Sequence, residues 1–340
     1  MSDKVLITGG AGFIGHALIE HLLINTDYEI VSLDRLDYSG NLNRISNMLE
    51  NYENSTKKRL QIVHHDLKAE INRLVSNKIT DVKHIFHLAA SSHVDRAIDE
   101  PMSFVMDNVV ATCNLLNFSR SLNNLESFFY FSTDEVFGPA NKGVKYKEWD
   151  RYNSTNPYSA SKAGGEELAV SFQNTYGLPI VITHCMNVFG KRQHPEKYIP
   201  NTISKILKGE KSTIHSDKDN NPGSRHYVHT DDVSSAVIEI VRNRKELEKN
   251  KYDKFGANCL KVNIASSLEL NNFEVADVIA KKLNKKFDYE FIDVPSNRPG
   301  HDLRYALDNS VLSSIGWKAK KSDQKGIEDV VDWYLKNQIW

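Results

Sequence analysis

Cysteine is scarce in this sequence, which contains only Cys113, Cys185 and Cys259 among its 340 residues. The three are widely spaced, their number is odd, and no two of them form a C-x-x-C pair. A disulfide framework of the kind that stabilises small secreted domains is therefore not predicted. We expect a reducing compartment and a cytoplasmic location.

Long apolar runs and an excess of charge of one sign are absent as well. No run is long enough to span a bilayer, and no signal peptide precedes the first predicted strand, which begins near Val5. The net charge is −1, so no global field draws the protein to nucleic acid or to anionic lipid. The 13 histidines form neither H-E-x-x-H nor H-x-H. We therefore expect no nucleic-acid partner, no membrane partner and no metal.

A glycine-rich turn near the N-terminus is the first positive signal. An apolar run over 5–7 leads into Thr8–Gly15, whose glycines separate a predicted strand from a helix predicted over 13–24. Glycines leave room for a pyrophosphate to approach the backbone N–H groups at the positive end of a helix. The pattern predicts a dinucleotide cofactor held by Gly9, Gly12, Phe13, Ile14 and Gly15.

The next strand, predicted over 29–33, ends at Asp34. An acidic residue about twenty positions beyond the last glycine suits the adenosine ribose hydroxyls and repels a 2′-phosphate, so we predict NAD and not NADP. Arg35 follows directly, and a basic neighbour could accommodate that phosphate. A simple turn role is the structural alternative for Asp34.

Two further predicted strands end on residues suited to the same cofactor. The run 60–67 ends with Asp66 and Leu67. Asp66 could hydrogen-bond adenine, or it could cap the helix predicted over 68–76. The run 84–90 ends with Leu88, Ala89 and Ala90, where small residues let a cofactor pass close to the backbone.

Strand and helix patterns alternate five times before residue 140. That alternation is typical of an α/β protein with a doubly wound parallel sheet of the Rossmann type. A sixth strand is predicted over 179–185, and beyond it short strands and helices are interrupted by polar turns. We predict an NAD-binding domain over 1–186 and a smaller C-terminal α/β substrate-binding domain over 187–340, with some segments returning to the first.

The stretch Ser127–Gly138 is the centre of the predicted site. Its first half is a charge-free aromatic run that predicts a strand buried on both faces, and the run stops at Ser132, Thr133, Asp134 and Glu135. Adjacent carboxyls at the carboxyl end of a buried strand repel each other, and burial raises their pKa values, so one can act as an acid while the other stays a base. The structural alternative is a helix N-cap, for which Ser, Thr and Asp are all suited.

A tyrosine and a lysine follow on a helix predicted from Asn156 to Tyr176. Tyr158 and Lys162 are four residues apart and therefore share one face of that helix. A lysine beside a tyrosine favours the phenolate and lowers the tyrosine pKa towards neutral. Most such pairs are solvated helix surface, but this one follows a glycine-rich turn and an acidic pair, and the combination predicts a redox site.

With these residues in place, the chain resembles the extended short-chain dehydrogenase/reductase family, and within it the nucleotide-sugar 4,6-dehydratases acting on dTDP-glucose or UDP-glucose. The most specific motif is Thr133-Asp134-Glu135, because related epimerases carry small or hydroxyl residues at the two acidic positions and related decarboxylases carry serine for the aspartate. The resemblance spans nearly the whole chain and also rests on 8–15, 89–96, 158–162, 194–197, Arg225 and 297–302.

The resemblance implies a role for each of five catalytic residues. Tyr158, supported by Lys162, would take the proton from the sugar 4-hydroxyl, to which Thr133 would hydrogen-bond, while NAD⁺ accepts the C4 hydride. Glu135 would remove the C5 proton and Asp134 would protonate the departing 6-hydroxyl. Hydride return to C6 would regenerate the cofactor and leave a 4-keto-6-deoxy sugar, as in rhamnose biosynthesis.

The resemblance also implies which residues contact the nucleotide-sugar substrate. Arg225 would bind the pyrophosphate and Arg298 would lie near the nucleotide, although either arginine could form a surface ion pair instead. The neighbourhood of Val188 and Gln193 is somewhat more similar to UDP-glucose enzymes. The predicted substrate-binding residues are Ser92, Thr133, Asn187, Glu196, Lys197, Arg225, Arg298 and His301.

Two competing functions stay open at this point. One is C4 epimerisation or decarboxylation of a nucleotide sugar on the same scaffold. The other is a regulator that senses NAD(H) without turnover, a class that typically lacks the Y-x-x-x-K pair. The resemblance also implies a homodimer formed by the helices over 101–122 and 155–176, whose apolar positions are equally compatible with a core.

Overall fold

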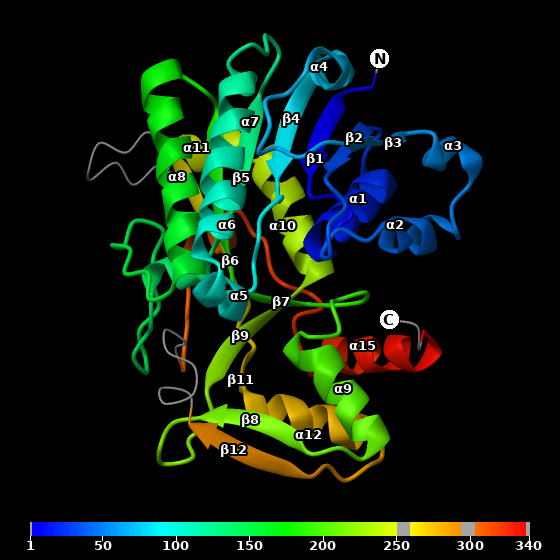
Figure 1. Cartoon of the computed structure of the whole chain (residues 1–340), viewed down its shortest axis with the longest axis vertical. Coiled ribbons are helices and arrows are strands. Elements are labelled where there is room, and N and C mark those ends of the chain that lie inside the picture. Colours follow the sequence, from blue (N-terminus) through cyan, green and yellow to red (C-terminus); the bar gives the residue numbers. More distant parts are fainter. Residues whose placement is uncertain (1, 250–258, 294–302, 338–340) are drawn as a thin grey trace.

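The large parallel sheet organises the molecule, whose computed structural model describes residues 2–249, 259–293 and 303–337. Seven strands form this sheet in the order β10-β6-β5-β4-β1-β2-β3, and all neighbours are parallel (Figure 1). The order 3-2-1-4-5-6 is that of doubly wound dinucleotide-binding sheets and reverses between β1 and β4, where such sheets bind ligands at the carboxyl ends of the strands. The strands are β1 Lys4–Thr8, β2 Glu29–Asp34, β3 Leu60–His64, β4 Val82–His87, β5 Ser127–Thr133, β6 Ile180–Cys185 and β10 Leu260–Ile264.

Helices cover both faces of the sheet, and two of them differ from the sequence prediction. The helix predicted over 101–122 is divided by a π-helical turn, η1 (Met106–Val110). The helix predicted over 68–76 begins only at Arg73, because the side chain of Asn72 caps it by accepting hydrogen bonds from two backbone N–H groups. The helices on this sheet are α1 Phe13–Asn25, α2 Leu42–Leu49, α3 Asn54–Lys57, α4 Arg73–Ile79, α5 Val94–Asp99, α6 Pro101–Val105, α7 Ala111–Ser119, α8 Pro157–Tyr176, α10 Thr230–Arg242, α11 Arg244–Lys249 and α14 Ser310–Ser314.

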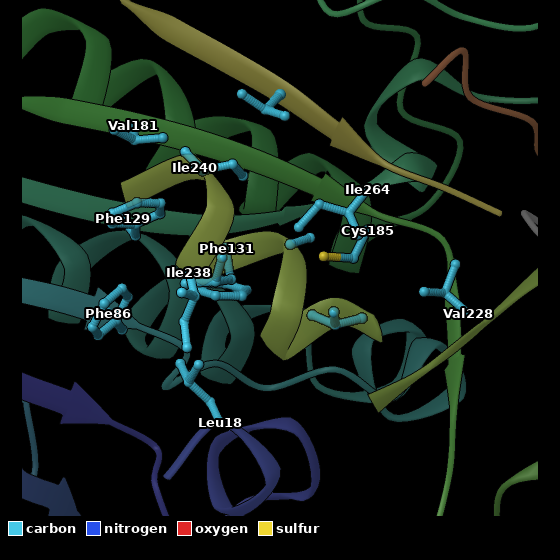
Figure 2. Packing of buried hydrophobic residues seen from close by; sticks show 14 of the residues in the cluster. Leu18, Phe86, Phe129, Phe131, Val181, Cys185, Val228, Ile238, Ile240 and Ile264 are labelled. Carbon is cyan, nitrogen blue, oxygen red and sulfur yellow. The ribbon is translucent and has the colours of Figure 1, made fainter. Parts of the chain in front are cut away.

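Strand β5 lies inside the sheet, and all seven of its residues are buried. Successive side chains of a strand point to opposite faces, so this aromatic strand contributes to two separate cores. Phe129 and Phe131 pack with α1 and α10 on one face (Figure 2). Phe128 and Tyr130 pack with α7 and α8 on the other face. The prediction of a strand covered on both sides is therefore confirmed.

The remaining elements of the described residues form two small sheets and three helices beyond the carboxyl end of β6, in the lower half of Figure 1. They have an apolar core of their own, which includes Phe189, Ile203 and Ile279. After residue 187 the chain returns to the large sheet with β10, while α10 packs beside α1. The division into domains at residue 187 stays a prediction. The elements are β7 Asn187–Phe189, β8 Ser212–Ser216, β9 Ser224–His229, β11 Glu269–Asn271, β12 Tyr289–Asp293, α9 Tyr198–Lys208, α12 Asn272–Lys282 and α15 Gln324–Lys336.

Across the described ranges, no helix combines the length and the apolar character that crossing a membrane requires.

Candidate active site

The glycine-rich turn connects β1 to α1 at the carboxyl edge of the sheet. Gly9 has a left-handed backbone with φ +73°, and a Cβ there would lie 2.8 Å from the backbone nitrogen of Ala89. A Cβ on Gly15 would lie only 2.2 Å from the carbonyl oxygen of Gly9. These two positions therefore require glycine. Gly12 is the N-cap of α1 and has no side chain to cap it, so the first N–H groups of the helix are available to an anion.

Asp34 is buried at the end of β2 and binds two backbone N–H groups. Its Oδ2 accepts from Ala11 at 3.1 Å and its Oδ1 accepts from Leu36 at 2.8 Å. The residue thus shapes a turn, as the structural alternative proposed, and it also ties that turn to the glycine-rich segment. Burial raises the pKa of Asp34.

Arg35 is held by carboxylates. Its Nη2 donates to Asp107 at 2.7 Å and its Nε donates to Asp37 at 2.7 Å. Hydrogen bonding to Asp107 raises the pKa of Arg35. A 2′-phosphate at this position would meet Asp34 and Asp37 beside an arginine that is already paired, so the local charge favours NAD over NADP.

The 11 cofactor residues named so far line one cavity of about 250 Å³, together with Tyr158 and Lys162, which are also predicted to contact the cofactor. Asp66 is one, and its Oδ1 accepts from the backbone N–H of Lys68 at 3.0 Å. This contact closes a turn, so the alternative in which Asp66 caps a helix is wrong. The direct contact of each residue with the cofactor stays a prediction.

A second cavity of about 630 Å³ adjoins the first, and Ser92, Tyr158 and Cys185 line both. Arg298 and His301 lie outside the described residues. The other predicted substrate residues all line this second cavity, together with the acidic pair; they are Ser92, Thr133, Asn187, Glu196, Lys197 and Arg225.

Asp134 follows β5 directly and occupies a buried position. The N-cap alternative applies to Thr133, whose side chain accepts from the backbone N–H of Glu135 at 3.3 Å and caps a short 3₁₀ turn, η2 (Asp134–Phe137). Asp134 Oδ1 accepts from the Thr133 hydroxyl at 3.0 Å, whereas Oδ2 has no hydrogen-bond partner among the described residues. Burial and the neighbouring Glu135 raise the pKa of Asp134 to about 7. This carboxyl can therefore hold a proton near neutral pH.

Glu135 differs from its neighbour in exposure and in hydrogen bonding. It is only partly buried, and its Oε2 accepts from Asn156 Nδ2 at 3.1 Å. A donor aimed at a carboxylate stabilises the ionised form. The two adjacent carboxyls thus lie in contrasting environments, as the acid and base assignment requires.

Tyr158 and Lys162 lie buried on one face of α8. The expectation that Lys162 lowers the pKa of Tyr158 is wrong for the chain alone. Burial and the charge of Glu135 raise the pKa of Tyr158, and a hydrogen bond with Thr133 lowers it by less. Burial also lowers the pKa of Lys162, to about 7, so its own positive charge is destabilised. The Nζ of Lys162 lies 4.3 Å from the centre of the Tyr130 ring.

The sequence reading missed the π-helical turn that supports this helix. Asn108 in η1 is buried, and its Nδ2 donates to the carbonyl of Ser91 at 3.0 Å and to the hydroxyl of Ser161 at 2.9 Å. Its neighbour Asp107 accepts from the Ser91 hydroxyl at 2.6 Å and also holds Arg35. Single-turn π segments occur frequently at functional sites. Two polar residues within an otherwise apolar helical run were the available signal.

On the substrate side of the site, Glu196 and Arg225 both form hydrogen bonds with other residues. Arg96 donates to Glu196 at 3.3 Å and stacks 3.8 Å from the centre of the Tyr38 ring, which links three segments at the mouth of the cavities. Arg225 donates to the backbone carbonyl of Ser224 at 2.8 Å, and its charge lowers the pKa of Asp134 against the larger effect of burial. Arg225 also lines the second cavity. Its role in binding the pyrophosphate and the ion-pair alternative both stay predictions.

Comparison with known proteins agrees with this geometry. A family model described as GDP-mannose 4,6 dehydratase matches residues 6–330. The dTDP-glucose 4,6-dehydratase of Salmonella typhimurium is 35% identical over 363 residues, covering 99% of this chain and 94% of that protein. The low-salt glycan biosynthesis protein Agl12 of Haloferax volcanii is also 35% identical, covering 97% and 98%. The solved DesIV structure from Streptomyces venezuelae, a dTDP-glucose 4,6-dehydratase with NAD bound, is 31% identical with a TM-score of 0.84, covering 99% and 98%.

A Rossmann sheet, a glycine-rich turn and a Y-x-x-x-K helix together define an extended short-chain dehydrogenase/reductase. The chain belongs to the nucleotide-sugar 4,6-dehydratases of that family, as an NAD-dependent NDP-glucose 4,6-dehydratase. The family, fold class, enzyme class and cofactor predicted from the sequence are therefore confirmed. The roles of the individual residues stay predictions.

Proposed function

We propose that the enzyme converts dTDP-glucose to its 4-keto-6-deoxy product, with Tyr158, Glu135 and Asp134 as the proton-transfer groups. The contrast between the two adjacent carboxyls carries this proposal. Asp134 is buried with one oxygen unpartnered among the described residues, and Glu135 accepts a hydrogen bond from Asn156. Elimination of water needs one group that gives a proton and one that takes a proton, and positioned groups of this kind each contribute roughly 10²–10⁴ in rate.

The residues of the cleft divide the reaction between them. Tyr158 takes the proton of the sugar 4-hydroxyl, and Thr133 orients that hydroxyl. Bound NAD, held by the glycine-rich turn and Asp34, would accept the C4 hydride, return it to C6 and supply the positive charge that helps to form the phenolate. Glu135 takes the C5 proton, which the C4 ketone acidifies. Asp134 gives its proton to the 6-hydroxyl, so that water leaves across C5 and C6.

The relatives from Salmonella and Streptomyces, which act on dTDP-glucose, support the choice of dTDP. Gln193 was one of the residues that favoured UDP. Its side-chain Nε2 donates to the backbone carbonyl of Val188 at 3.0 Å, and its backbone carbonyl accepts from the Tyr334 hydroxyl at 3.0 Å. These contacts stabilise the turn after β7, which gives Gln193 a structural explanation independent of the nucleobase.

Incubation with dTDP-glucose and with UDP-glucose, followed by mass spectrometry of the product, tests the proposal. We expect loss of one water from dTDP-glucose and a faster reaction with this substrate than with UDP-glucose. A product that keeps its 6-hydroxyl and differs only at C4 would instead make the protein an epimerase. Dehydration of UDP-glucose alone would overturn the choice of nucleotide.

A homodimer is the second part of the proposal. Large apolar side chains are exposed on α5, α6 and η1, where Ile98, Met102, Val105 and Met106 are 40%, 68%, 38% and 38% exposed. These residues lie on adjoining elements, so they supply the apolar centre of an interface. A second copy of the chain, docked through this face and the adjacent α8, would bury them.

We also infer a cytoplasmic location. Cys113, Cys185 and Cys259 are all free thiols in the structure. Free thiols are typical of compartments in which disulfides are kept reduced. Labelling the native and unfolded protein with a thiol reagent after purification from cells would test this.

A further inference from the structure

Asn156 links the two halves of the active site. It is buried immediately before Pro157 at the start of α8, the helix that carries Tyr158 and Lys162. Its Oδ1 accepts from the backbone N–H of Ser159 at 2.9 Å and caps the helix. Its Nδ2 donates to Glu135 Oε2 at 3.1 Å. One side chain therefore contacts both the end of the redox helix and the carboxylate that follows β5.

The two contacts fix the orientation of the Asn156 amide. Only the amide oxygen can accept from the backbone N–H of Ser159, so the NH₂ group must point to Glu135. The flipped amide would place its oxygen against a carboxylate oxygen and its NH₂ against an N–H group, and both contacts would be repulsive. The Ser159 hydroxyl, which accepts from the backbone N–H of Asn156 at 3.3 Å, completes a capping box.

We propose that Asn156 is a positioning residue that holds Glu135, in its ionised form, at a fixed place relative to Tyr158. This inference rests on the proposed dehydration. Asn156 lines neither of the two cavities, so it acts by donating to the base and by capping the helix that carries the tyrosine. Glu135 belongs to the short turn η2, which directly follows β5, and the hydrogen bond from Asn156 ties the end of its side chain to α8. As a consequence, the tyrosine that serves oxidation at C4 and the glutamate that removes the C5 proton keep fixed positions relative to each other.

The contact with Asn156 also adds to the difference between the adjacent carboxyls. A neutral donor stabilises the ionised Glu135 without adding charge to the site. Asp134 also accepts one neutral donor, the Thr133 hydroxyl, but it lies deeper, and burial outweighs that hydrogen bond and raises its pKa. Burial thus favours Asp134 as the acid, and Asn156 supports Glu135 as the base.

Two substitutions separate this positioning role from helix capping. Serine is as good an N-cap as asparagine but too short to reach Glu135, so Asn156→Ser keeps the cap and removes the contact. Asn156→Asp also keeps the cap and directs a carboxylate oxygen at Glu135. Asn72, which lines neither cavity and caps α4 by accepting from Leu74 and Val75, gives matched controls as Asn72→Ser and Asn72→Asp.

The readouts are bound NAD, single-turnover formation of NADH on dTDP-glucose, and release of the dehydrated product across pH 5 to 9. We expect both Asn156 variants to keep NAD and to form NADH at nearly the wild-type rate. Product formation should fall about tenfold to a hundredfold, which is the size of a lost hydrogen bond to a charged group. In Asn156→Asp the acid limb of the product-formation profile should move to higher pH, because a second carboxylate disfavours ionisation of the base.

Equal losses in NADH formation and product formation would assign Asn156 to helix capping alone and overturn the proposal. Losses no larger than in the Asn72 variants would overturn it as well. Failure of the proposed function itself would look different, because wild-type enzyme would then release no dehydrated product from either nucleotide sugar.

Discussion

Replacement of Asp134 by asparagine should make the protein more stable at alkaline pH while it abolishes elimination. Burial and Glu135 raise the pKa of this carboxyl from 3.8 to about 7. The folded chain therefore holds a proton, between about pH 4 and pH 7, that the unfolded chain has already released. Since the folded state binds more protons, stability falls as pH rises through this window, and above pH 7 the full penalty for an ionised buried carboxylate applies.

The size of the effect follows from the two pKa values. A difference of about 3 between the folded and unfolded chain corresponds to about 4 kcal/mol in the free energy of unfolding. Asparagine cannot ionise, has the same shape, and keeps an oxygen for the Thr133 hydroxyl, which lies 3.0 Å away. The gain in stability over the wild type should therefore grow by about 2–3 kcal/mol between pH 5 and pH 8.

Urea unfolding of the wild type and of Asp134→Asn at both pH values measures this gain. Asp107→Asn is the control: Asp107 is buried too, but hydrogen bonds from Arg35 and Ser91 lower its pKa. A carboxyl whose pKa is lowered by folding stabilises the protein fully above its unfolded pKa, and this stability is lost only as the pH falls towards the pKa of the folded chain. The Asp107 substitution should therefore destabilise the protein equally at pH 5 and pH 8. If the effect of Asp134→Asn is also the same at both pH values, Asp134 ionises as it does in the unfolded chain and is not suited to be the acid.

Three further substitutions test the cofactor site, the base and the interface. Glu135→Gln should keep NAD and form NADH on substrate but release product about 10²–10⁴ times more slowly; product release at the wild-type rate in a stopped assay would remove Glu135 from the mechanism. Gly15→Ala places a Cβ 2.2 Å from a backbone oxygen and should purify without NAD, whereas Gly164→Ala, 3.3 Å from a valine side chain, should retain it; equal NAD contents by absorbance would contradict this reading of the turn. Met102→Lys should yield monomers by light scattering, and Leu74→Lys, at an exposed position on α4, should not; a dimer in both variants would place the interface elsewhere.

Local sequence patterns predicted most of the large sheet because its strands are apolar runs that end at polar or acidic residues. The aromatic run before Ser132 and the run before Asp34 are of this kind. Strand β10 was not predicted, because its identity depends on pairing with β6, as in Leu260 beside Val181, and that partner is about 80 residues away in the chain. The π-helical turn at 106–110 was not predicted either, because a single inserted residue leaves no periodicity of its own in the sequence.

The candidate site was predicted where its residues are neighbours in sequence. Asp134 and Glu135 are adjacent, and Tyr158 and Lys162 are one helical turn apart, so spacing alone places each pair together. Asn156 has the sequence signature of an N-cap before a proline at the first helical position. Its second partner, Glu135, is 21 residues earlier, and only the tertiary structure brings the two together.

The pKa values of Tyr158 and Lys162 differ from the sequence expectation because the effect of burial outweighs the effect of pairing. Lys162 was expected to favour the phenolate of Tyr158, but the same burial that raises the pKa of the tyrosine lowers the pKa of the lysine to about 7. Asp134, with a pKa of about 7, is shifted towards neutrality in the same way. All three groups are therefore held near their uncharged forms, and no preformed ion pair has to be broken before a proton can move. Glu135 differs from these three groups, since it is less buried and accepts a hydrogen bond from Asn156, and this contrast with Asp134 is why we assign Glu135 the role of the base.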